Sequence, residues 1–322
     1  MNVAASLFGA AWEVRRRLYA RGWLAPRRVA SRVISVGNLT VGGTGKTTLV
    51  LHLVRLAHAR GMKAAVVARD YHPGPDGRSD ESILYTNAFG AERVFTGRRK
   101  LEQAMRAAAA GCSPIVVDDG FSTWALERDL DIVLLDAQDL WGGGRLLPAG
   151  RLREPRRALQ RAEVVVISRL ARGADPSPWI AEARRYAPAA TFAAGRHRVT
   201  GARRLGGAPV APGGRVRVVT ATGSPEAVAV SAAEAGFEVT GLARYRDHHW
   251  FSAAEARLEG RLAGQSGSQV LVTAKDAVRW PAAVTDPSPL VLEVEWSWVS
   301  GGEAVEQRAL AVSAAAPAQA GV

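Results

Sequence analysis

The stretch that decides the fold is Val33-Ile-Ser-Val-Gly-Asn-Leu-Thr-Val-Gly-Gly-Thr-Gly-Lys-Thr-Thr48, and a helical pattern follows it over residues 49–59. It opens with a β-branched run, continues as a glycine-rich loop and ends where the helix starts. Gly42, Gly43 and Gly45 let backbone N–H groups converge, and the N-terminus of a helix adds partial positive charge. The stretch therefore predicts a strand, a loop that binds phosphate and a helix, in that order.

Each residue of this loop has a predicted part in binding a nucleoside triphosphate. Lys46 is expected to contact the β- and γ-phosphates, and the hydroxyl of Thr47 is expected to ligate Mg²⁺. ATP and Mg²⁺ are therefore the predicted cofactors. The strict pattern of such loops begins with glycine, where this chain has Thr40, and a purely structural glycine loop is the alternative. The residues expected to line the nucleotide are Thr40, Val41, Gly42, Gly43, Thr44, Gly45, Lys46, Thr47 and Thr48.

Outward from the loop, short apolar runs alternate with helical patterns along most of the chain. Because parallel strands are joined by right-handed crossovers, this alternation predicts an α/β fold with a mostly parallel sheet and helices on both faces. Together with the loop, the pattern is typical of a P-loop nucleoside triphosphatase fold. Functional loops in such sheets follow the carboxyl ends of the strands. The expected strands are 33–36, 64–67, 115–117, 132–135 and 164–167, followed by 216–220, 237–242 and 270–273.

The length of 322 residues exceeds that of a usual single domain, so about two α/β units are expected. A segment rich in glycine and arginine, residues 195–216, interrupts the rhythm of strands and helices. We expect a nucleotide-binding domain over residues 29–195 and a smaller α/β domain over residues 196–312. Residues 1–28 form a separate helical segment, and the alanine-rich residues 313–322 are predicted to be a flexible tail.

A second chemical motif, Ile115-Val-Val-Asp-Asp-Gly-Phe121, is an apolar strand that ends in two carboxylates. Asp118, at the end of the strand, is placed to hold the Mg²⁺ shell together with Thr47. Asp119 is expected to assist catalysis or to face the phosphate acceptor. Aspartates at strand ends also occur as simple turn residues, which is the alternative for both.

The composition limits the classes of partner. The formal charge of +12 predicts attraction to phosphates, nucleic acid or an anionic membrane surface. Neither a recognition helix nor an aromatic-basic platform indicates nucleic-acid binding, and no obligate protein partner is evident. Cys112 stands alone, which excludes an internal disulfide and a cysteine-built metal site and favours a reducing, cytoplasmic compartment.

The first 28 residues combine an apolar run with a cluster of arginines. On a helix, Leu7, Ala11, Val14 and Leu18 share one face, while the arginines from position 15 onward surround the rest. This pattern is typical of a helix that lies in a membrane interface, with arginines reaching lipid phosphates. No run approaches the ~20 apolar residues that cross a bilayer. A helix packed on the domain core is the alternative.

These motifs, together with three further stretches, resemble tetraacyldisaccharide 4'-kinase, the lipid A 4'-kinase of Gram-negative bacteria. The further stretches are Arg145-Leu-Leu-Pro-Ala-Gly-Arg-Leu-Arg-Glu-Pro155, Asp247-His-His249 and Thr273-Ala-Lys-Asp-Ala-Val-Arg279. The resemblance implies an ATP-dependent kinase that phosphorylates the 4'-hydroxyl of a tetraacyl glucosamine disaccharide 1-phosphate, a lipid A disaccharide precursor. It also implies attachment to the cytoplasmic face of the bacterial inner membrane, where that acceptor lies in the cytoplasmic leaflet.

The resemblance also implies roles for residues outside the loop. Asp80 and His248 match the catalytic dyad of the family, in which a carboxylate and an imidazole take the proton of the acceptor hydroxyl. Glu81 is implied as a further ligand of Mg²⁺. Glu154 belongs, with Arg153, to a segment near the nucleotide, although the two alone are typical of a surface ion pair. The catalytic residues are thus expected to be Asp80, His248, Lys46 and Asp119.

The chain departs from the family at several positions, most of them on the acceptor-facing side. Ala68-Arg-Asp-Tyr-His72 stands where the family has Ser-Arg-Gly-Tyr-Gly, Ser122 and Thr123 stand in place of Gln-His, Ser79-Asp-Glu-Ser82 replaces Gly-Asp-Glu-Pro, and Thr48 replaces proline. The departures at Ala68, Asp70, His72, Ser122 and Thr123 bear on the acceptor and on the activity. Two alternatives stay open: a related kinase with another glycolipid acceptor, and a nucleotide-binding regulator without transfer activity.

Overall fold

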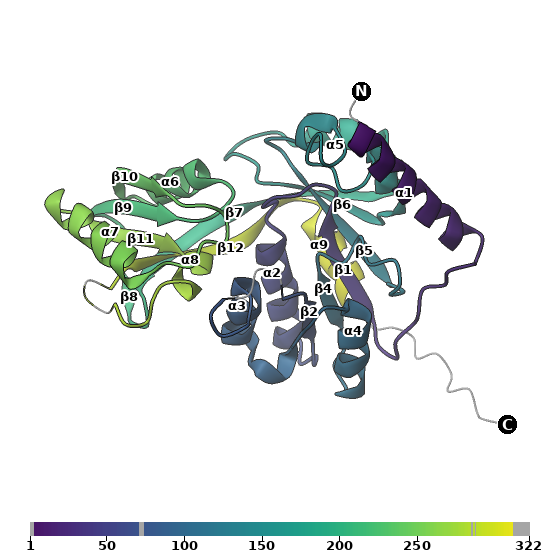
Figure 1. Cartoon of the computed structure of the whole chain (residues 1–322), viewed down its shortest axis with the longest axis horizontal. Coiled ribbons are helices and arrows are strands. Elements are labelled where there is room, and N and C mark those ends of the chain that lie inside the picture. Colours follow the sequence, from purple (N-terminus) through teal and green to yellow (C-terminus); the bar gives the residue numbers. More distant parts are fainter. Residues whose placement is uncertain (1–2, 71–73, 285, 287, 312–322) are drawn as a thin grey trace.

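The computed structural model of the chain describes residues 3–70, 74–284, 286 and 288–311. Within these ranges one sheet has the strand order β10-β9-β11-β12-β7-β6-β5-β1-β4-β2-β3, and β8 pairs with β7. Neighbours in this order run parallel except β7 and β12, which are antiparallel. Figure 1 shows two lobes joined through this sheet. The mostly parallel α/β fold predicted from the sequence is confirmed.

The larger lobe holds the phosphate-binding loop and the parallel strands that flank it. Its strands are β1 (Val33–Asn38), β2 (Ala65–Ala68), β3 (Val94–Thr96), β4 (Ile115–Asp118), β5 (Leu130–Asp136) and β6 (Val164–Ser168). Its helices are α1 (Val3–Ala20), α2 (Lys46–Ala59), α3 (Asp80–Phe89), α4 (Lys100–Ala109), α5 (Ser177–Arg184) and α9 (Gly302–Leu310), with 3₁₀ turns η1 (Ala91–Arg93), η2 (Gly142–Gly144) and η3 (Arg156–Arg161). β1, β2, β4 and β6 are buried along their whole lengths, as strands covered on both faces must be.

Helices cover both faces of this lobe. On one face, Leu53 of α2 and Val305 of α9 share a core with Ile34 of β1. On the other, Ala104 of α4 packs in a core with β2 and β4, while α1, η3 and α5 contribute to a core over β5 and β6. The sheet is therefore a central layer between helices. In sheets of this kind, ligands bind at the loops that follow the carboxyl ends of the strands.

In the described residues, the smaller lobe contains three parallel strands, the short strand β8, which is antiparallel to β7, and three helices. Its elements are β8 (Pro209–Val210), β9 (Arg215–Thr220), β10 (Glu238–Arg244) and β11 (Gln269–Thr273) with α6 (Pro225–Glu234), α7 (Ala253–Gln265) and α8 (Ala274–Val278). Ala232 of α6 packs on one face of the strands with Val218, and Ala256 of α7 packs on the other with Val219. This lobe is thus a second three-layered unit, smaller than the first.

A long antiparallel ribbon of β7 (Thr191–Arg204) and β12 (Leu290–Ser300) joins the two lobes. Neither strand was among those expected from the sequence, and the expected boundary after residue 195 falls inside β7. After β12 the chain returns to the larger lobe, where Val305 of α9 is fully buried. The domain limits inferred from the sequence therefore stay a proposal, and the expected tail at 313–322 lies outside the described residues.

The N-terminal helix forms as α1 and rests on the larger lobe through Trp12, which is buried. Its predicted apolar face points outward: Leu7 and Val14 are 66% and 57% exposed. None of the described helices is both long and apolar enough to cross a membrane. α1 therefore has one side packed on the protein and one apolar side exposed.

Candidate active site

The phosphate-binding loop lies between β1 and α2, at the carboxyl end of the parallel strands. Gly42 and Gly45 have φ angles of 110° and 85°, in the region that only glycine adopts freely. Because α2 begins at Lys46, its N-terminal N–H groups and partial positive charge lie at the loop. The hydroxyl of Thr44 is buried and finds no hydrogen-bond partner among the described residues. A polar atom buried in this way is costly unless a ligand satisfies it, so the loop fits an anion.

Asp118 ends β4 beside the loop, as predicted. Tyr85 donates a hydrogen bond of 2.8 Å to its Oδ2. Its Oδ1 is buried and has no partner within the described part of the chain. Burial, and then the negative charge of Glu81, raise the pKa of Asp118 to about 6. A cation at this carboxylate would relieve both effects, so the residue fits a ligand of Mg²⁺.

Glu81 and Thr47, the other expected Mg²⁺ ligands, are in contact with each other. The Thr47 hydroxyl donates to the Glu81 carboxylate at 3.3 Å. Nowhere in the described ranges do three or more His, Cys, Asp or Glu residues gather in a way that could hold a metal ion. Mg²⁺ in phosphate-transfer sites needs only one or two carboxylates, because phosphates and water complete its shell. The donor set is therefore compatible with Mg²⁺ bound together with a nucleotide.

Asp119 is the centre of a cluster of positive charges. Arg153 donates two hydrogen bonds to its carboxylate, at 2.7 and 2.6 Å, and Lys46 Nζ lies 3.9 Å from the same group. Lys100 donates to the Asp119 carbonyl oxygen at 2.6 Å. Burial opposes the charge of Asp119, but the hydrogen bonds from Arg153 and the charge of Lys46 hold its pKa well below the usual range. Because such a carboxylate is a weak base, the geometry favours a role in positioning Arg153 and Lys46.

Asp80 and His248 meet although 168 positions separate them. The Nδ1 atom of His248 lies 3.1 Å from Oδ2 of Asp80, and Arg279 lies 3.6 Å from the same oxygen. Burial opposes the charge of Asp80, but the hydrogen bond with His248 and the charge of Lys275 lower its pKa to about 2. The same hydrogen bond raises the pKa of His248. An ionised carboxylate of the larger lobe therefore holds an imidazole of the smaller lobe.

Lys275, at the start of α8, makes a second contact between the lobes. Its Nζ lies 2.5 Å from Glu81 Oε1. The charge of Lys275 is the main cause that lowers the pKa of Glu81. Burial opposes the charge of Lys275, but Glu81 and Asp80 raise its pKa. Asp80 and Glu81, two adjacent acidic residues of α3, thus each contact a basic residue of the smaller lobe.

Comparison with known proteins decides the family. The profile of the tetraacyldisaccharide-1-P 4'-kinases, LpxK, matches residues 1–312. The chain belongs to this family. The tetraacyldisaccharide 4'-kinase of Anaeromyxobacter sp. (strain K) is 36% identical over 98% of this chain and 90% of that protein. The enzyme of the same description from Halorhodospira halophila is 35% identical over 85% of this chain and 81% of that protein. The family and the kinase activity expected from the motifs are thereby confirmed.

A solved structure supports the fold of this kinase. LpxK from Aquifex aeolicus in complex with ATP superposes with a TM-score of 0.69 and 21% identity, over 94% of this chain and 95% of that chain. At this identity the likeness establishes the shared arrangement of strands and helices. The roles of individual side chains in this kinase follow from their own contacts and distances.

In this kinase, Glu154 lies under the N-terminal helix. Trp12 Nε1 and Ser122 Oγ each donate to its carboxylate at 3.0 Å, and Arg161 forms a close ion pair with it. The residue is only 3% exposed. These three donors come from α1, from the segment after β4 and from η3, so Glu154 joins α1 to the lobe. Its expected contact with the nucleotide stays a prediction.

Two positions that depart from the family pattern have defined contacts. Ser122 is the donor to Glu154 described above, so it faces inward. Asp70 accepts a long hydrogen bond of 3.5 Å from Ser79, which caps α3. His72 lies outside the described residues. Ser122 and Asp70 therefore lie next to residues that hold α1 and the start of α3.

The scarcity of lysine gives a further signal, which adds Lys100 and Lys275 to the predicted Lys46. Only four of the 42 basic residues are lysines, and three of them, Lys46, Lys100 and Lys275, lie in this site. A lysine ammonium is a compact point charge that the planar arginine fork does not reproduce. Because nearly all other basic residues of this chain are arginines, the few lysines indicate positions that require a compact point charge. Tyr85 carried no sequence signal, and Arg279 stood only at the end of a stretch that resembles the family.

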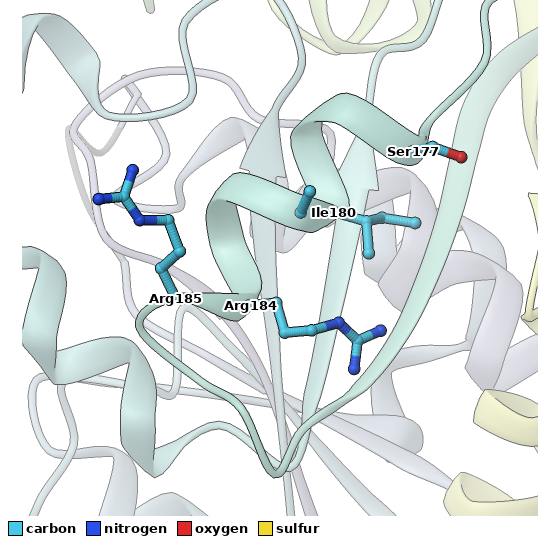
Figure 2. Close-up of a pocket in the computed structure, with 5 residues that line it drawn as sticks. Ser177, Ile180, Arg184 and Arg185 are labelled. Atoms are coloured by element: carbon cyan, nitrogen blue, oxygen red, sulfur yellow. The ribbon is translucent and has the colours of Figure 1, made fainter.

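A pocket of about 430 Å³ lies elsewhere, against α5. Figure 2 shows Ser177, Ile180, Arg184 and Arg185 around it, and Ala181 also lines it. None of the predicted site residues is among these. The pocket therefore has no part in the chemistry described above.

Proposed function

We propose that this kinase transfers the γ-phosphate of ATP to the 4'-hydroxyl of a tetraacyl glucosamine disaccharide 1-phosphate. The observation that carries the proposal is the meeting of two groups of residues at one place. The larger lobe contributes the phosphate-binding loop and Asp118, and the smaller lobe contributes His248 and Lys275. The contacts Asp80–His248, at 3.1 Å, and Glu81–Lys275, at 2.5 Å, bring the groups together.

The larger lobe binds and orients the phosphates. Lys46 and the N–H groups at the start of α2 stabilise charge on the β- and γ-phosphates as the bond breaks. Thr47, Asp118 and Glu81 would hold Mg²⁺, which would supply further positive charge to the phosphates. Asp119 holds Lys46 and the adjacent Arg153 in place.

The smaller lobe provides the base. Because Nδ1 of His248 is hydrogen-bonded to Asp80, Nε2 is the ring atom that takes the proton of the acceptor hydroxyl. Asp80 fixes the tautomer and stabilises the positive ring that forms. A charged carboxylate beside the imidazole does this without taking the proton itself.

The N-terminal helix attaches the enzyme to the cytoplasmic leaflet of the inner membrane. Val3, Leu7 and Val14 of α1 expose apolar side chains, and Trp23, just beyond the helix, is 72% exposed. Arginines on the same segment suit the phosphates of anionic lipids. A groove of about 500 Å³ runs beneath α1 and is lined by the aromatic residues Trp12, Tyr19 and Trp124, among others.

The test is a transfer assay with γ-labelled ATP and the purified tetraacyl disaccharide 1-phosphate in mixed micelles. We expect label at the 4' position and none on an acceptor whose 4'-hydroxyl is blocked. The Lys46→Ala variant provides the blank. Transfer to other glycolipids but not to this disaccharide would replace the proposed acceptor, and absence of transfer to any of them would leave a nucleotide-binding regulator.

A further inference from the structure

His197, on β7, faces the phosphate-binding loop from the ribbon between the lobes. A Cβ atom placed on Gly45 would lie only 2.8 Å from its Nε2, so the imidazole is in contact with the loop. That Nε2 atom is buried and has no hydrogen-bond partner among the residues that the structure describes. An unsatisfied ring nitrogen is therefore held against the glycine that precedes Lys46.

Positive groups surround this imidazole. Arg169 donates to the carbonyl oxygen of Gly43 at 3.0 Å and to Asp136 at 2.8 Å, so its guanidinium is fixed at the loop. Burial, then the charges of Arg169 and Lys275, lower the pKa of His197 to about 4. The ring is therefore neutral at pH 7 and carries one N–H donor. In the tautomer that carries the proton on Nε2, this donor has no partner among the described residues and lies beside Arg169 and a helix N-terminus, an environment suited to an anion.

We propose that His197 is a further nucleotide-binding residue, whose Nε2–H donates a hydrogen bond to the phosphates that ATP and ADP share. The choice of phosphate follows from position: backbone N–H groups of such loops cradle the α- and β-phosphates, whereas the lysine side chain reaches the β- and γ-phosphates. His197 contacts the loop at Gly45, the residue before Lys46, where backbone N–H groups of such loops bind the α- and β-phosphates. The inference rests on the assignment of residues 40–48 as the nucleotide loop.

His197 also connects the nucleotide to the ribbon. It pairs with Trp296 of β12 across the two strands, and the two rings lie edge to face at 6.3 Å. Trp296 is buried in the core that contains α2. The imidazole therefore has a fixed orientation before the nucleotide binds, which lowers the entropy cost of the hydrogen bond it makes.

Nucleotide affinity of two variants tests the proposal. In His197→Leu the side chain keeps similar bulk and loses the donor, and in His197→Gln an amide N–H replaces the ring N–H. Calorimetric titration with ATP and with ADP, each with Mg²⁺, is expected to show both affinities lowered about 10-fold to 100-fold in His197→Leu, the usual worth of a hydrogen bond to a charged group. His197→Gln is expected to recover most of the loss.

The chain offers a matched control in His52 of α2. Its ring also lies edge to face with a tryptophan of β12, Trp298, at 6.1 Å, but its Nε2 lies 2.7 Å from Glu306 of α9 rather than at the loop. His52→Leu is expected to bind both nucleotides with the affinity of the parent. Circular dichroism and thermal melting establish that each variant is folded.

Three outcomes would overturn the proposal. They are parental affinity in His197→Leu, an equal loss in His52→Leu, and a loss for ATP that ADP does not share. Lys46→Ala separates this failure from failure of the loop assignment. Because Lys46→Ala removes a cation expected to contact the β- and γ-phosphates, it should bind ATP more weakly than the parent. If it does so while His197→Leu binds normally, the nucleotide loop stands and only the role of His197 falls.

Discussion

Replacing Asp80 by asparagine tests the catalytic dyad with little change in shape. The perturbation removes the charge that lies 3.1 Å from His248 Nδ1. During proton transfer the ring becomes positive, so the transition state loses a hydrogen bond to a charged group, worth ~1.5–3 kcal/mol. Turnover of Asp80→Asn should therefore fall roughly 10-fold to 150-fold. His248→Ala removes the proposed base itself and should lower turnover further, by about 10²–10⁴-fold.

The pH profile gives an independent signature of the same pair. The hydrogen bond to Asp80 raises the pKa of His248, and the proposed base is the neutral ring. The acidic limb of the activity profile in the parent enzyme should therefore lie above the ordinary histidine pKa of about 6.5. In Asp80→Asn the limb should move to lower pH. Since the folded pKa of His248 is raised, the stability it contributes is full below that ordinary value and is lost as pH rises through the folded pKa.

Steady-state kinetics on the disaccharide acceptor, with ATP affinity measured separately, provide the assay. ATP affinity should barely change in either variant, because neither side chain belongs to the phosphate-binding loop. Residues that act as one unit lose their effect together, so Asp80→Asn combined with His248→Ala should be little slower than His248→Ala alone. Fully multiplicative losses, or an acidic limb that stays in place in Asp80→Asn, would refute the dyad.

Three shorter predictions follow from other parts of the structure. Lys46→Ala removes a fixed cation from the transferred phosphate and should lower kcat by roughly 10²–10³-fold or more with an unchanged melting temperature, and parental rates in a folded variant would contradict the loop assignment. Leu7→Glu combined with Val14→Glu places charge on the exposed side of α1 and should reduce cosedimentation with anionic liposomes, whereas full retention would locate the anchor elsewhere. Trp12→Phe deletes the N–H donor to the buried Glu154 and should destabilise the protein by about 1–3 kcal/mol, measured by urea unfolding; an unchanged midpoint would mean that α1 is not held by this bond.

The fold could be predicted where the sequence pattern is local. The buried parallel strands β1, β4 and β6 are short β-branched runs, and the runs themselves indicate strands. β7 could not be found in this way because it is half exposed along much of its length and contains arginines and glycines. Its partner β12 lies more than 80 positions further along the chain, and their pairing depends on the smaller lobe that folds between them.

The site divides in the same way. The phosphate-binding loop and Asp118 follow from adjacent residues, because a strand end, glycines and a helix start are enough to specify them. The pairing of Asp80 with His248 came from family resemblance alone, since no local pattern links residues 168 positions apart. Glu81 and Lys275 are 194 positions apart, and no local pattern predicts their contact either.

The ribbon of β7 and β12 has an evolutionary and an engineering consequence. Arg204 and Leu290 are paired across it, and Leu205 N–H donates to the Pro289 carbonyl oxygen at 2.9 Å. The smaller lobe therefore enters and leaves the larger one at a single point, as an insertion into one β-hairpin. Insertions with adjacent ends are readily gained, exchanged or excised, because the host needs only a short turn to close the gap. Exchange of this module between relatives would transplant His248, the proposed catalytic base, and leave the phosphate-binding loop untouched.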